Sequence, residues 1–211
     1  MSAAPQPAPQ QQPAGWYDRG PKRAFDLAIL CTAHILLLPV WLLLWLVISL
    51  TLLATQGRPL FYTQKRIGRN AKPFRAWKFR TMVRDADRVG PAWTDRDDPR
   101  VTAVGRALRR TALDELPQVL NIALGDMSFV GPRALARAEV EELERRGLAV
   151  ARRTPVRPGL TGLAQLYSDR GDPDQKLSLD IRYIESMSPL LDLKIVLLSV
   201  WNSLTRKWDQ A

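Results

Sequence analysis

The sequence has almost no cysteine or histidine: its 211 residues include one of each, Cys31 and His34. A single cysteine excludes an intramolecular disulfide framework and a zinc site built on cysteines. A single histidine likewise argues against a catalytic histidine triad or a metal cluster built on histidines. Any chemistry that this chain performs must therefore rest on carboxylates, lysines and arginines.

Negative charge is also in short supply. The chain has 21 Asp and Glu residues against 31 Lys and Arg, which gives a formal net charge of +10. Such an excess favours an anionic partner, which is nucleic acid, phospholipid headgroups or a phosphorylated substrate. A chain of 211 residues has room for one domain with a sizeable core and a short appendage.

Two stretches lack charge altogether. Residues 1–15 are rich in Pro, Gln and Ala, and we expect this tail to be disordered. Leu27 to Gly57 also carries no formal charge, but it consists mostly of Leu, Ile, Val, Ala and Trp. Because this run exceeds the ~20 apolar residues that a membrane helix needs, it is predicted to enter a bilayer.

A proline near the middle of this apolar run, Pro39, argues against one spanning helix. The two halves, Ala24–Leu38 and Val40–Ala54, are each too short to cross ~30 Å at 1.5 Å per residue. Both flanks are basic, as cytoplasmic flanks are. They contain Lys22, Arg23, Arg58, Lys65, Arg66, Arg69 and Lys72. We therefore prefer a re-entrant helix–break–helix over residues 16–56, with Pro39 at the break, to a single transmembrane anchor.

A basic and aromatic segment follows. Residues 59–67 and 72–82 are predicted to form two short strands around a turn at Gly68–Ala71. The interleaved aromatic and basic side chains suit stacking on a base and pairing with phosphates, or contact with acidic headgroups. Both interpretations call for an anion.

Two adjacent carboxylates, Asp114 and Glu115, begin a segment with helical spacing that ends at Gly125. In one interpretation Thr111 is the N-cap of this helix. In the other, Asp114 is itself the N-cap and Pro117 lies in the first turn, where proline is tolerated. The second fits better. Upstream lie Arg100, Arg106, Arg109 and Arg110, so both carboxylates are expected to stay ionised.

The same pair has a functional interpretation. A carboxylate can attack phosphorus to give an acyl phosphate, and its neighbour can hold Mg²⁺, which needs only one or two carboxylates plus substrate phosphates. Basic groups would neutralise charge on the phosphoryl oxygens. The candidates are Asp114, Glu115, Lys78, Arg109, Arg133 and Arg157. Loops rich in glycine and proline around Arg133 and Arg157 would let backbone amides approach a phosphate.

The remaining segments are helical in pattern. Ala134–Arg153 is dense in charge and is predicted to be a solvated helix, broken near Gly147. Ser186–Trp208 is a second apolar element. It suits either a core helix or an interfacial helix with its tryptophans at headgroup depth.

Six segments, taken in order, resemble the monotopic phosphoglycosyl transferases, also called bacterial sugar transferases. The resemblance runs from about Lys22 to about Trp201, and the six segments together are highly specific. They are Lys22-Arg-Ala-Phe-Asp26 before the broken apolar run, residues 57–68, Trp77-Lys-Phe-Arg-Thr-Met82, Leu113-Asp-Glu-Leu-Pro-Gln118, Gly125-Asp-Met-Ser-Phe-Val-Gly-Pro-Arg133 and Arg157-Pro-Gly-Leu-Thr-Gly162.

This resemblance implies an enzyme that moves a sugar-1-phosphate from a UDP-sugar to undecaprenyl phosphate and releases UMP, which starts glycan assembly. It implies a ping-pong mechanism in which Asp114 attacks the β-phosphorus and carries the phospho-sugar. Glu115 would bind Mg²⁺, and Lys78 and Arg109 would lie near the phosphates. The implied substrate-binding residues are Arg133, Arg157, Gly159, Gly162, Gln165 and Arg170.

The implied fold is α+β and mostly helical, in a monotopic protein of the cytoplasmic face of a bacterial inner membrane. Residues 57–211 would form the catalytic domain, with an interfacial C-terminal helix. The implied partners are the UDP-sugar, undecaprenyl phosphate and membrane lipid, without nucleic acid; a homodimer is compatible with the family. The competing hypothesis is a membrane-tethered basic module that binds anionic lipid or nucleic acid without catalysis.

The sequence also departs from the family pattern. The membrane break reads Leu38-Pro39 where the family often has Ser-Pro, so a side-chain hydrogen bond is missing there. The family's Pro-Arg-Pro reads Pro132-Arg133-Ala134. The family's Gly-Trp-Ala-Gln followed by Asn-Gly-Arg reads Gly162-Leu-Ala-Gln165 and then Leu166-Tyr-Ser-Asp-Arg170. Arg170 would replace the family's arginine there, with an offset of one residue.

Overall fold

The computed structural model describes residues 15–90, 98–168 and 172–205. The predicted disordered tail, apart from its last residue, lies outside these ranges, and so do Arg170 and Trp208. The described part is mostly helical with two small sheets, as the α+β prediction required.

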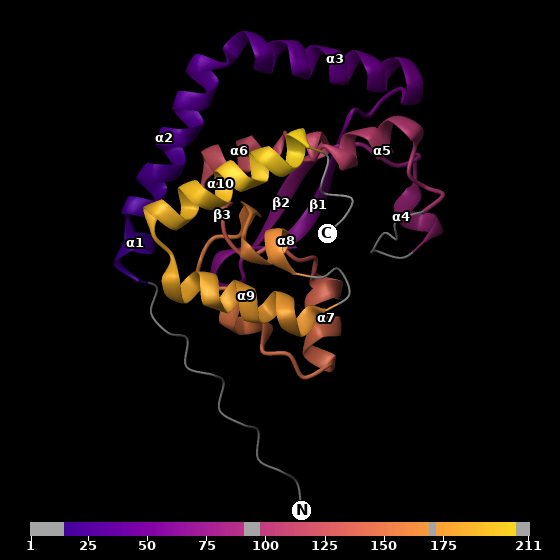
Figure 1. The fold of residues 1–211 in the computed structure, drawn as a ribbon. Helices are drawn as coiled ribbons and strands as arrows, with labels where there is room; N and C mark the ends of the chain where they lie inside the picture. Colours follow the sequence, from indigo (N-terminus) through magenta and orange to yellow (C-terminus); the bar gives the residue numbers. More distant parts are fainter. Residues whose placement is uncertain (1–14, 91–97, 169–171, 206–211) are drawn as a thin grey trace, which may run out of the picture.

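Two helices form the apolar N-terminal segment (Figure 1). After the short α1 (Trp16–Arg19), α2 (Pro21–Leu36) rises along the molecule, and α3 (Leu38–Gln56) turns away and crosses the top. Leu37, with φ −113° and ψ 20°, makes the break, and Pro39 lies in the first turn of α3, where its missing N–H costs no helical hydrogen bond. The predicted pair of helices is therefore present, but the break lies at Leu37 and not at Pro39, and the re-entrant course through a membrane stays a prediction.

The prediction that each half of the apolar run is too short to cross a membrane was wrong for the second half. The helix α3 has 19 residues and is long and apolar enough to cross a membrane by length and composition. The extra length arises because Pro39 belongs to the first turn of α3 and the helix continues to Gly57, which ends it with a left-handed backbone at φ 66°.

Across the break, the rings of His34 and Trp41 stack, with their centroids 4.7 Å apart and their planes 6° from parallel. The Nδ1 atom of His34 also lies 2.8 Å from the carbonyl oxygen of Leu30. His34 thus faces the break and the protein, as expected. The ring pair joins the last turn of α2 to the first turn of α3, where the family's serine would have made a hydrogen bond.

The predicted hairpin is present. Strands β1 (Phe61–Ile67) and β2 (Pro73–Phe79) pair antiparallel, with Phe61 opposite Phe79. The turn between them, η1 (Arg69–Ala71), has left-handed backbones at Asn70 and Ala71. Phe79 packs with Ile48 and Leu52 of α3, so this cluster fixes the hairpin beneath the apolar helix.

Four short helical elements follow the hairpin. They are α4 (Ala86–Val89), α5 (Ala103–Arg110), η2 (Leu113–Glu115) and α6 (Gln118–Leu124). The N-cap of α5 is Thr102, whose hydroxyl accepts a hydrogen bond from the Gly105 amide at 2.9 Å. Gly125 ends α6 in the left-handed region, as predicted.

A second sheet was not predicted. Strands β3 (Ser128–Val130) and β4 (Gly159–Thr161) pair in parallel, and α7 (Arg137–Arg145) and η3 (Val150–Arg153) lie between them in the chain. The charge-dense helix α7 ends before Gly147, as expected, and Gly147 has a left-handed backbone with φ 82°. Each strand has three residues, too few for a periodic pattern to show in the sequence.

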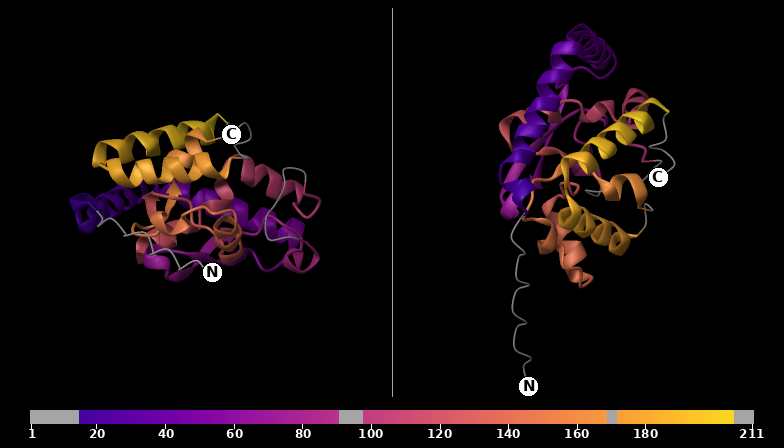
Figure 2. Two further views of the ribbon diagram at one scale, coloured as in Figure 1. Left: turned by 90° about the horizontal axis from the view of Figure 1, so that it is seen from below. Right: turned by 60° about the vertical axis from the view of Figure 1, so that its left-hand side comes forward.

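The C-terminal part contains α8 (Leu163–Tyr167), α9 (Pro173–Ser186) and α10 (Pro189–Leu204), and Figure 2 shows α9 and α10 on the same side of the molecule. Ile195 of α10 is buried with Val130 and Tyr183 in a second core cluster. The other face of α10 is exposed and apolar, through Leu190, Leu193, Leu197, Val200, Trp201 and Leu204. The buried face agrees with the core-helix interpretation, and the interfacial interpretation stays a prediction for the exposed face.

Buried charges join the N-terminal helices to the rest of the fold. The ammonium of Lys22 lies 2.6 Å from Asp192 Oδ2 and 3.4 Å from Asp26 Oδ1, and all three side chains are buried. The hydroxyls of Tyr17 and Tyr183 also donate to Asp192, at 2.9 Å and 2.7 Å. Asp26 Oδ1 also accepts hydrogen bonds from the Ser128 hydroxyl and the Phe129 amide, so these contacts fix α2 against both α10 and β3.

Candidate active site

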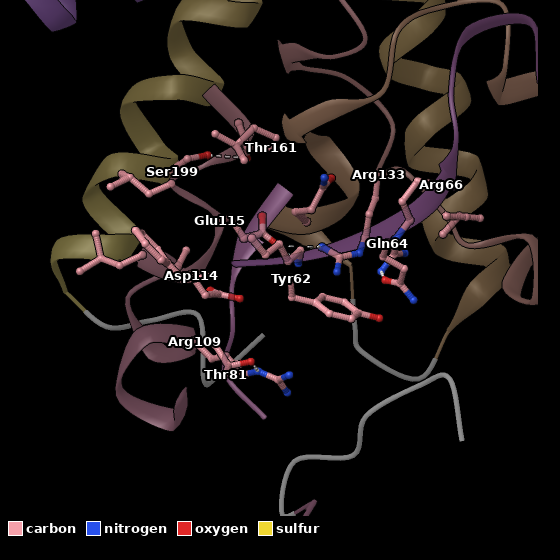
Figure 3. Close-up of a pocket in the computed structure, with 18 of the residues that line it drawn as sticks. Tyr62, Gln64, Arg66, Thr81, Arg109, Asp114, Glu115, Arg133, Thr161 and Ser199 are labelled. Atoms are coloured by element: carbon pink, nitrogen blue, oxygen red, sulfur yellow. Dashed lines mark hydrogen bonds and ion pairs between the residues drawn. The ribbon is translucent and has the colours of Figure 1, made fainter. Parts of the chain in front are cut away.

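A cavity of about 1580 Å³ lies between the hairpin, the η2–α6 segment, the α2–α3 corner and the C-terminal helices. Its walls differ in character. Ile29, Ala33 and Leu37 of the N-terminal helices supply an apolar wall, while basic and acidic side chains supply another. Figure 3 shows the charged wall, with Glu115 between Asp114 and Arg133.

The two carboxylates lie in the 3₁₀ turn η2, which follows a left-handed backbone at Ala112 (φ 55°). Helix α6 begins only at Gln118, after Pro117. Neither capping interpretation is therefore correct: Asp114 caps no helix, and the Thr111 hydroxyl donates back to the Leu108 carbonyl at 3.1 Å. The reason is Pro117, which lacks an N–H and starts α6 three residues later than predicted.

Glu115 is held by two cations. Its Oε1 atom lies 2.5 Å from the ammonium of Lys78 and 3.9 Å from the Arg133 guanidinium. Burial alone would raise the pKa of Glu115, but these two cations hold it at about 2. The prediction that this carboxylate stays ionised is confirmed.

Asp114 differs from its neighbour although both lie in the same turn. Burial raises the pKa of Asp114 and the Glu115 charge adds to this effect, while Lys78, Arg109 and Arg133 oppose them. Burial thus opposes the ionisation predicted for this carboxylate, because its side chain is only 7% exposed. No hydrogen bond to the Asp114 side chain is found within the described ranges, so its oxygens are free to meet a ligand in the cavity.

The basic residues reach this wall from three elements. Lys78 comes from β2, Arg109 from the last turn of α5, and Arg133 from the loop after β3. The Nε atom of Arg109 donates to the Thr81 hydroxyl at 2.9 Å, which fixes the guanidinium beside Asp114 in Figure 3. Five predicted site residues from distant parts of the sequence thus line one cavity: Asp114, Glu115, Lys78, Arg109 and Arg133.

Other predicted residues have different surroundings. Arg157 donates to the Gly125 carbonyl at 2.8 Å and does not line the cavity. Gly159 and Gly162 do not line it either: a Cβ at Gly159 would lie 2.1 Å from the Gly131 nitrogen, and one at Gly162 would lie 2.3 Å from the Gly131 oxygen. These glycines allow two backbones to touch, and their contact with substrate stays a prediction. Gln165 does line the cavity, and its buried amide has no hydrogen-bond partner among the residues that the structure describes.

Sequence reasoning missed a row of polar side chains on β1. Tyr62, Gln64 and Arg66 alternate along the strand and line the cavity together. Arg66 donates to Glu139 Oε2 at 2.7 Å and to the Ala134 carbonyl at 3.0 Å. The alternation of period two is visible in the sequence, but it does not show that this face of the strand lines the cavity.

A metal at this wall would depend on few protein ligands. Across the described ranges, no group of three or more His, Cys, Asp or Glu side chains is placed to hold an ion. Mg²⁺ commonly uses one or two carboxylates, with the remaining positions filled by water and substrate phosphates. The ionised Glu115 and the unbonded Asp114 carboxylate fit that donor set.

Comparison with known proteins finds a family model and several similar chains. The family model described as bacterial sugar transferase matches residues 17–206. The UDP-glucose:undecaprenyl-phosphate glucose-1-phosphate transferase of Escherichia coli K12 is 38% identical over 193 residues, covering 88% of this chain and 40% of the relative. The exopolysaccharide production protein PSS of Rhizobium leguminosarum bv. phaseoli is 39% identical over 195 residues, covering 88% of this chain and 96% of the relative. A glucose-1-phosphate transferase of the same description from Caulobacter vibrioides is 41% identical over 190 residues, covering 87% of this chain and 70% of the relative.

Proposed function

This chain belongs to the bacterial sugar transferase family, and we propose that it transfers a sugar-1-phosphate from a UDP-sugar to undecaprenyl phosphate, releasing UMP, as the first step of exopolysaccharide assembly. The observation that carries the proposal is the unbonded Asp114 carboxylate, surrounded by Lys78, Arg109 and Arg133 in one cavity. The names of the E. coli and Rhizobium relatives support the acceptor and the glycan class.

In the first half-reaction, a carboxylate oxygen of Asp114 attacks the β-phosphorus of the UDP-sugar. A new bond forms between that oxygen and phosphorus, while the bond from phosphorus to the bridging oxygen breaks. UMP leaves with the electron pair of the broken bond. The raised pKa of Asp114 suits this role, because a carboxylate less stabilised by its surroundings is the better nucleophile once ionised.

In the second half-reaction, a phosphate oxygen of undecaprenyl phosphate attacks the same phosphorus atom. The acyl-phosphate bond breaks, and Asp114 regains its carboxylate. Lys78, Arg109 and Arg133 would neutralise charge on the phosphoryl oxygens in both steps, since fixed cations near a developing charge lower its energy. Mg²⁺ bound by Glu115 would supply further positive charge at the diphosphate.

The membrane arrangement belongs to the same proposal. A monotopic protein with a re-entrant α2–α3 on the cytoplasmic face of the inner membrane keeps both flanks on one side. Two contacts support this course. Arg69, after α3, lies 2.7 Å from Asp18, before α2, and Arg23 at the start of α2 donates to the Ala123 carbonyl of α6 at 2.8 Å. These contacts support a course in which both flanks of the apolar segment lie on one side of the bilayer.

A panel of UDP-sugars tests the proposed activity. The protein is incubated in detergent or nanodiscs with each UDP-sugar, undecaprenyl phosphate and Mg²⁺, and released UMP and the lipid product are quantified. We expect at least one UDP-sugar to give UMP and a polyprenyl-diphosphate-sugar in equal amounts, and Asp114→Asn to give neither. A basic binding module would give no turnover with any sugar, and that outcome would refute the proposal.

A further inference from the structure

A buried arginine near the end of α3 has no counter-ion among the described residues. Arg80 follows β2 directly, and only 8% of its surface is exposed. One guanidinium nitrogen, Nη2, donates to the carbonyls of Gln56 and Gly57, at 2.6 Å and 2.9 Å. The other two nitrogens, Nε and Nη1, are buried without a hydrogen-bond partner, and no carboxylate forms an ion pair with Arg80 in the part of the chain that the structure describes.

Such a group calls for an anion. A guanidinium carries five N–H donors and stays charged in proteins, and a buried charge is costly unless it is paired. The neighbouring charge has the same sign: burial and the Arg84 cation both lower the pKa of Arg80. Two unfilled nitrogens on one planar fork match two oxygens of a phosphate.

The position of Arg80 at the end of α3 points to a lipid as the source of that phosphate. Arg80 binds the last carbonyls of α3, which is the apolar helix long enough for a membrane. The exposed leucines of α3, among them Leu46, Leu50 and Leu53, end at this level. The carbonyls at the end of an apolar helix lie at the depth of lipid headgroups.

Arg80 also belongs to the cavity of the carboxylate pair. Arg80, Thr81, Arg84 and Arg109 line the same cavity as Asp114. Thr81, the next residue after Arg80, accepts the hydrogen bond from Arg109, whose strongest attraction is to the Asp114 carboxylate. A phosphate at Arg80 would therefore lie between the end of the membrane helix and the carboxylate that faces the cavity.

We propose that Arg80 binds the phosphate of a membrane lipid beneath the end of α3 and positions it toward Asp114. This inference rests on the proposed function. The shared chemistry is a lipid-borne phosphate, and it has two sources. One is the phosphomonoester of the acceptor polyprenyl phosphate, and the other is the phosphodiester of a bilayer phospholipid.

The test compares Arg80→Lys with Arg58→Gln in the full chain. Lysine keeps the charge and can still donate to the Gln56 and Gly57 carbonyls, but it lacks the second and third nitrogens of the fork. Arg58 is exposed at the same end of α3, so Arg58→Gln tests whether a surface charge at this level, rather than the buried Arg80, determines the lipid response. Three quantities are measured in nanodiscs: the KM for undecaprenyl phosphate, the yield of UMP from UDP-sugar alone, and the ratio of activities in phosphatidylglycerol and phosphatidylcholine.

If the acceptor phosphate binds at Arg80, Arg80→Lys raises the KM for undecaprenyl phosphate about ten-fold or more, with the UMP yield from UDP-sugar alone unchanged. If a phospholipid binds there, the KM stays as in the wild type and the preference for phosphatidylglycerol is lost. Arg58→Gln leaves all three quantities unchanged in both cases. A wild-type KM together with a wild-type lipid preference in Arg80→Lys would mean that Arg80 only fastens α3 to β2, and would overturn the inference.

A binding measurement keeps this test independent of turnover. Undecaprenyl phosphate or phosphatidylglycerol, added separately to protein in detergent, should raise the midpoint of thermal unfolding of wild type and Arg58→Gln, because a ligand of the native state stabilises it. The shift should be absent in Arg80→Lys. If no UDP-sugar gives turnover but this difference holds, the proposed function fails and the lipid-phosphate site stands. If Arg80→Lys shows the wild-type shift with both lipids, the site fails.

Discussion

At the scale of single residues, two neighbouring carboxylates have opposite electrostatic surroundings. Glu115 is bonded to Lys78 and its pKa is about 2, whereas the pKa of Asp114 is raised by burial. A difference of this kind separates a charge-holding group from a reactive one, which is how paired carboxylates take different roles in enzymes. The proposed division of labour, with Asp114 as nucleophile and Glu115 as the charge-holding residue, follows from these surroundings.

Lys78 forms an ion pair with Glu115, and in the proposed mechanism it also contacts the substrate phosphates. We expect Lys78→Met to lower kcat/KM for UMP release by about 100-fold or more, because one fixed cation is lost beside the reacting phosphorus. The control is Lys72→Met, which removes the same charge from an exposed position at the start of the same hairpin strand. An activity of Lys78→Met equal to that of the control would exclude a role for Lys78 in stabilising the transition state.

Asp180 should make stability depend on pH. Its pKa is raised from 3.8 to about 6, because burial outweighs the attraction of Arg153, whose Nη2 lies 2.5 Å away. The native state therefore holds this proton more tightly than the unfolded chain. The corresponding stability is fully present below pH 3.8 and is lost as pH rises through about 6, which amounts to about 3 kcal/mol.

The measurement is the free energy of unfolding of wild type and Asp180→Asn from pH 4 to 7.5. The stability of the wild type relative to Asp180→Asn should fall by that amount over this range, since asparagine does not titrate. Asp174→Asn, an exposed position on the same helix, should follow the wild-type curve. A constant difference between wild type and Asp180→Asn would contradict the raised pKa.

At the scale of secondary-structure elements, long patterns were predictable and short ones were not. The helix–break–helix and the hairpin carry their own signals, in Pro39 and in the turn at Gly68–Ala71. Strands β3 and β4 do not, because three residues show no period and their partners are some 30 residues apart in the chain. The start of α6 was also misjudged, since Pro117 and not a capping side chain decides it.

The glycines of this small parallel sheet offer a test at the same scale. A Cβ on Gly131 would lie 2.5 Å from the Arg157 carbonyl oxygen, so Gly131→Ala forces two backbones apart. We expect a loss of about 1–3 kcal/mol in the free energy of unfolding and a fall in UMP release, because Arg133 lies two residues away. Gly20→Ala, where no atom lies within 4 Å of the added Cβ, should leave both unchanged. Wild-type stability in Gly131→Ala would show that the close approach is not rigid.

At the scale of the whole molecule, the fold brings together residues that the sequence only suggested. Lys78, Arg109, Asp114 and Arg133 were named from their types and from the family resemblance, and they line one cavity. The sequence did not reveal the charged face of β1 or the two guanidinium nitrogens of Arg80 that have no partner among the described residues. Both features depend on how the folded chain surrounds the side chains. Burial and pairing, unlike residue type, are properties of the folded chain.

The proposed membrane arrangement predicts where labels react. In a Cys31→Ser background, single cysteines at Gly15→Cys and Lys72→Cys flank the apolar segment at exposed positions. In oriented inner-membrane vesicles, both should react with an impermeant maleimide from the cytoplasmic side, since Asp18 and Arg69 are in contact. Reaction from opposite sides would mean that α3 spans the bilayer and would refute the re-entrant course.

The central claim is that Asp114 carries the transferred phospho-sugar. The most direct measurement is the intact mass of the protein after incubation with an accepted UDP-sugar and Mg²⁺, without undecaprenyl phosphate. We expect the mass to rise by one phospho-sugar, with one UMP released per adduct, and the adduct to disappear when undecaprenyl phosphate is added. Asp114→Asn should show no adduct and no UMP. A wild-type enzyme that turns over with both substrates but never forms the adduct, or UMP release that persists in Asp114→Asn, would contradict the account.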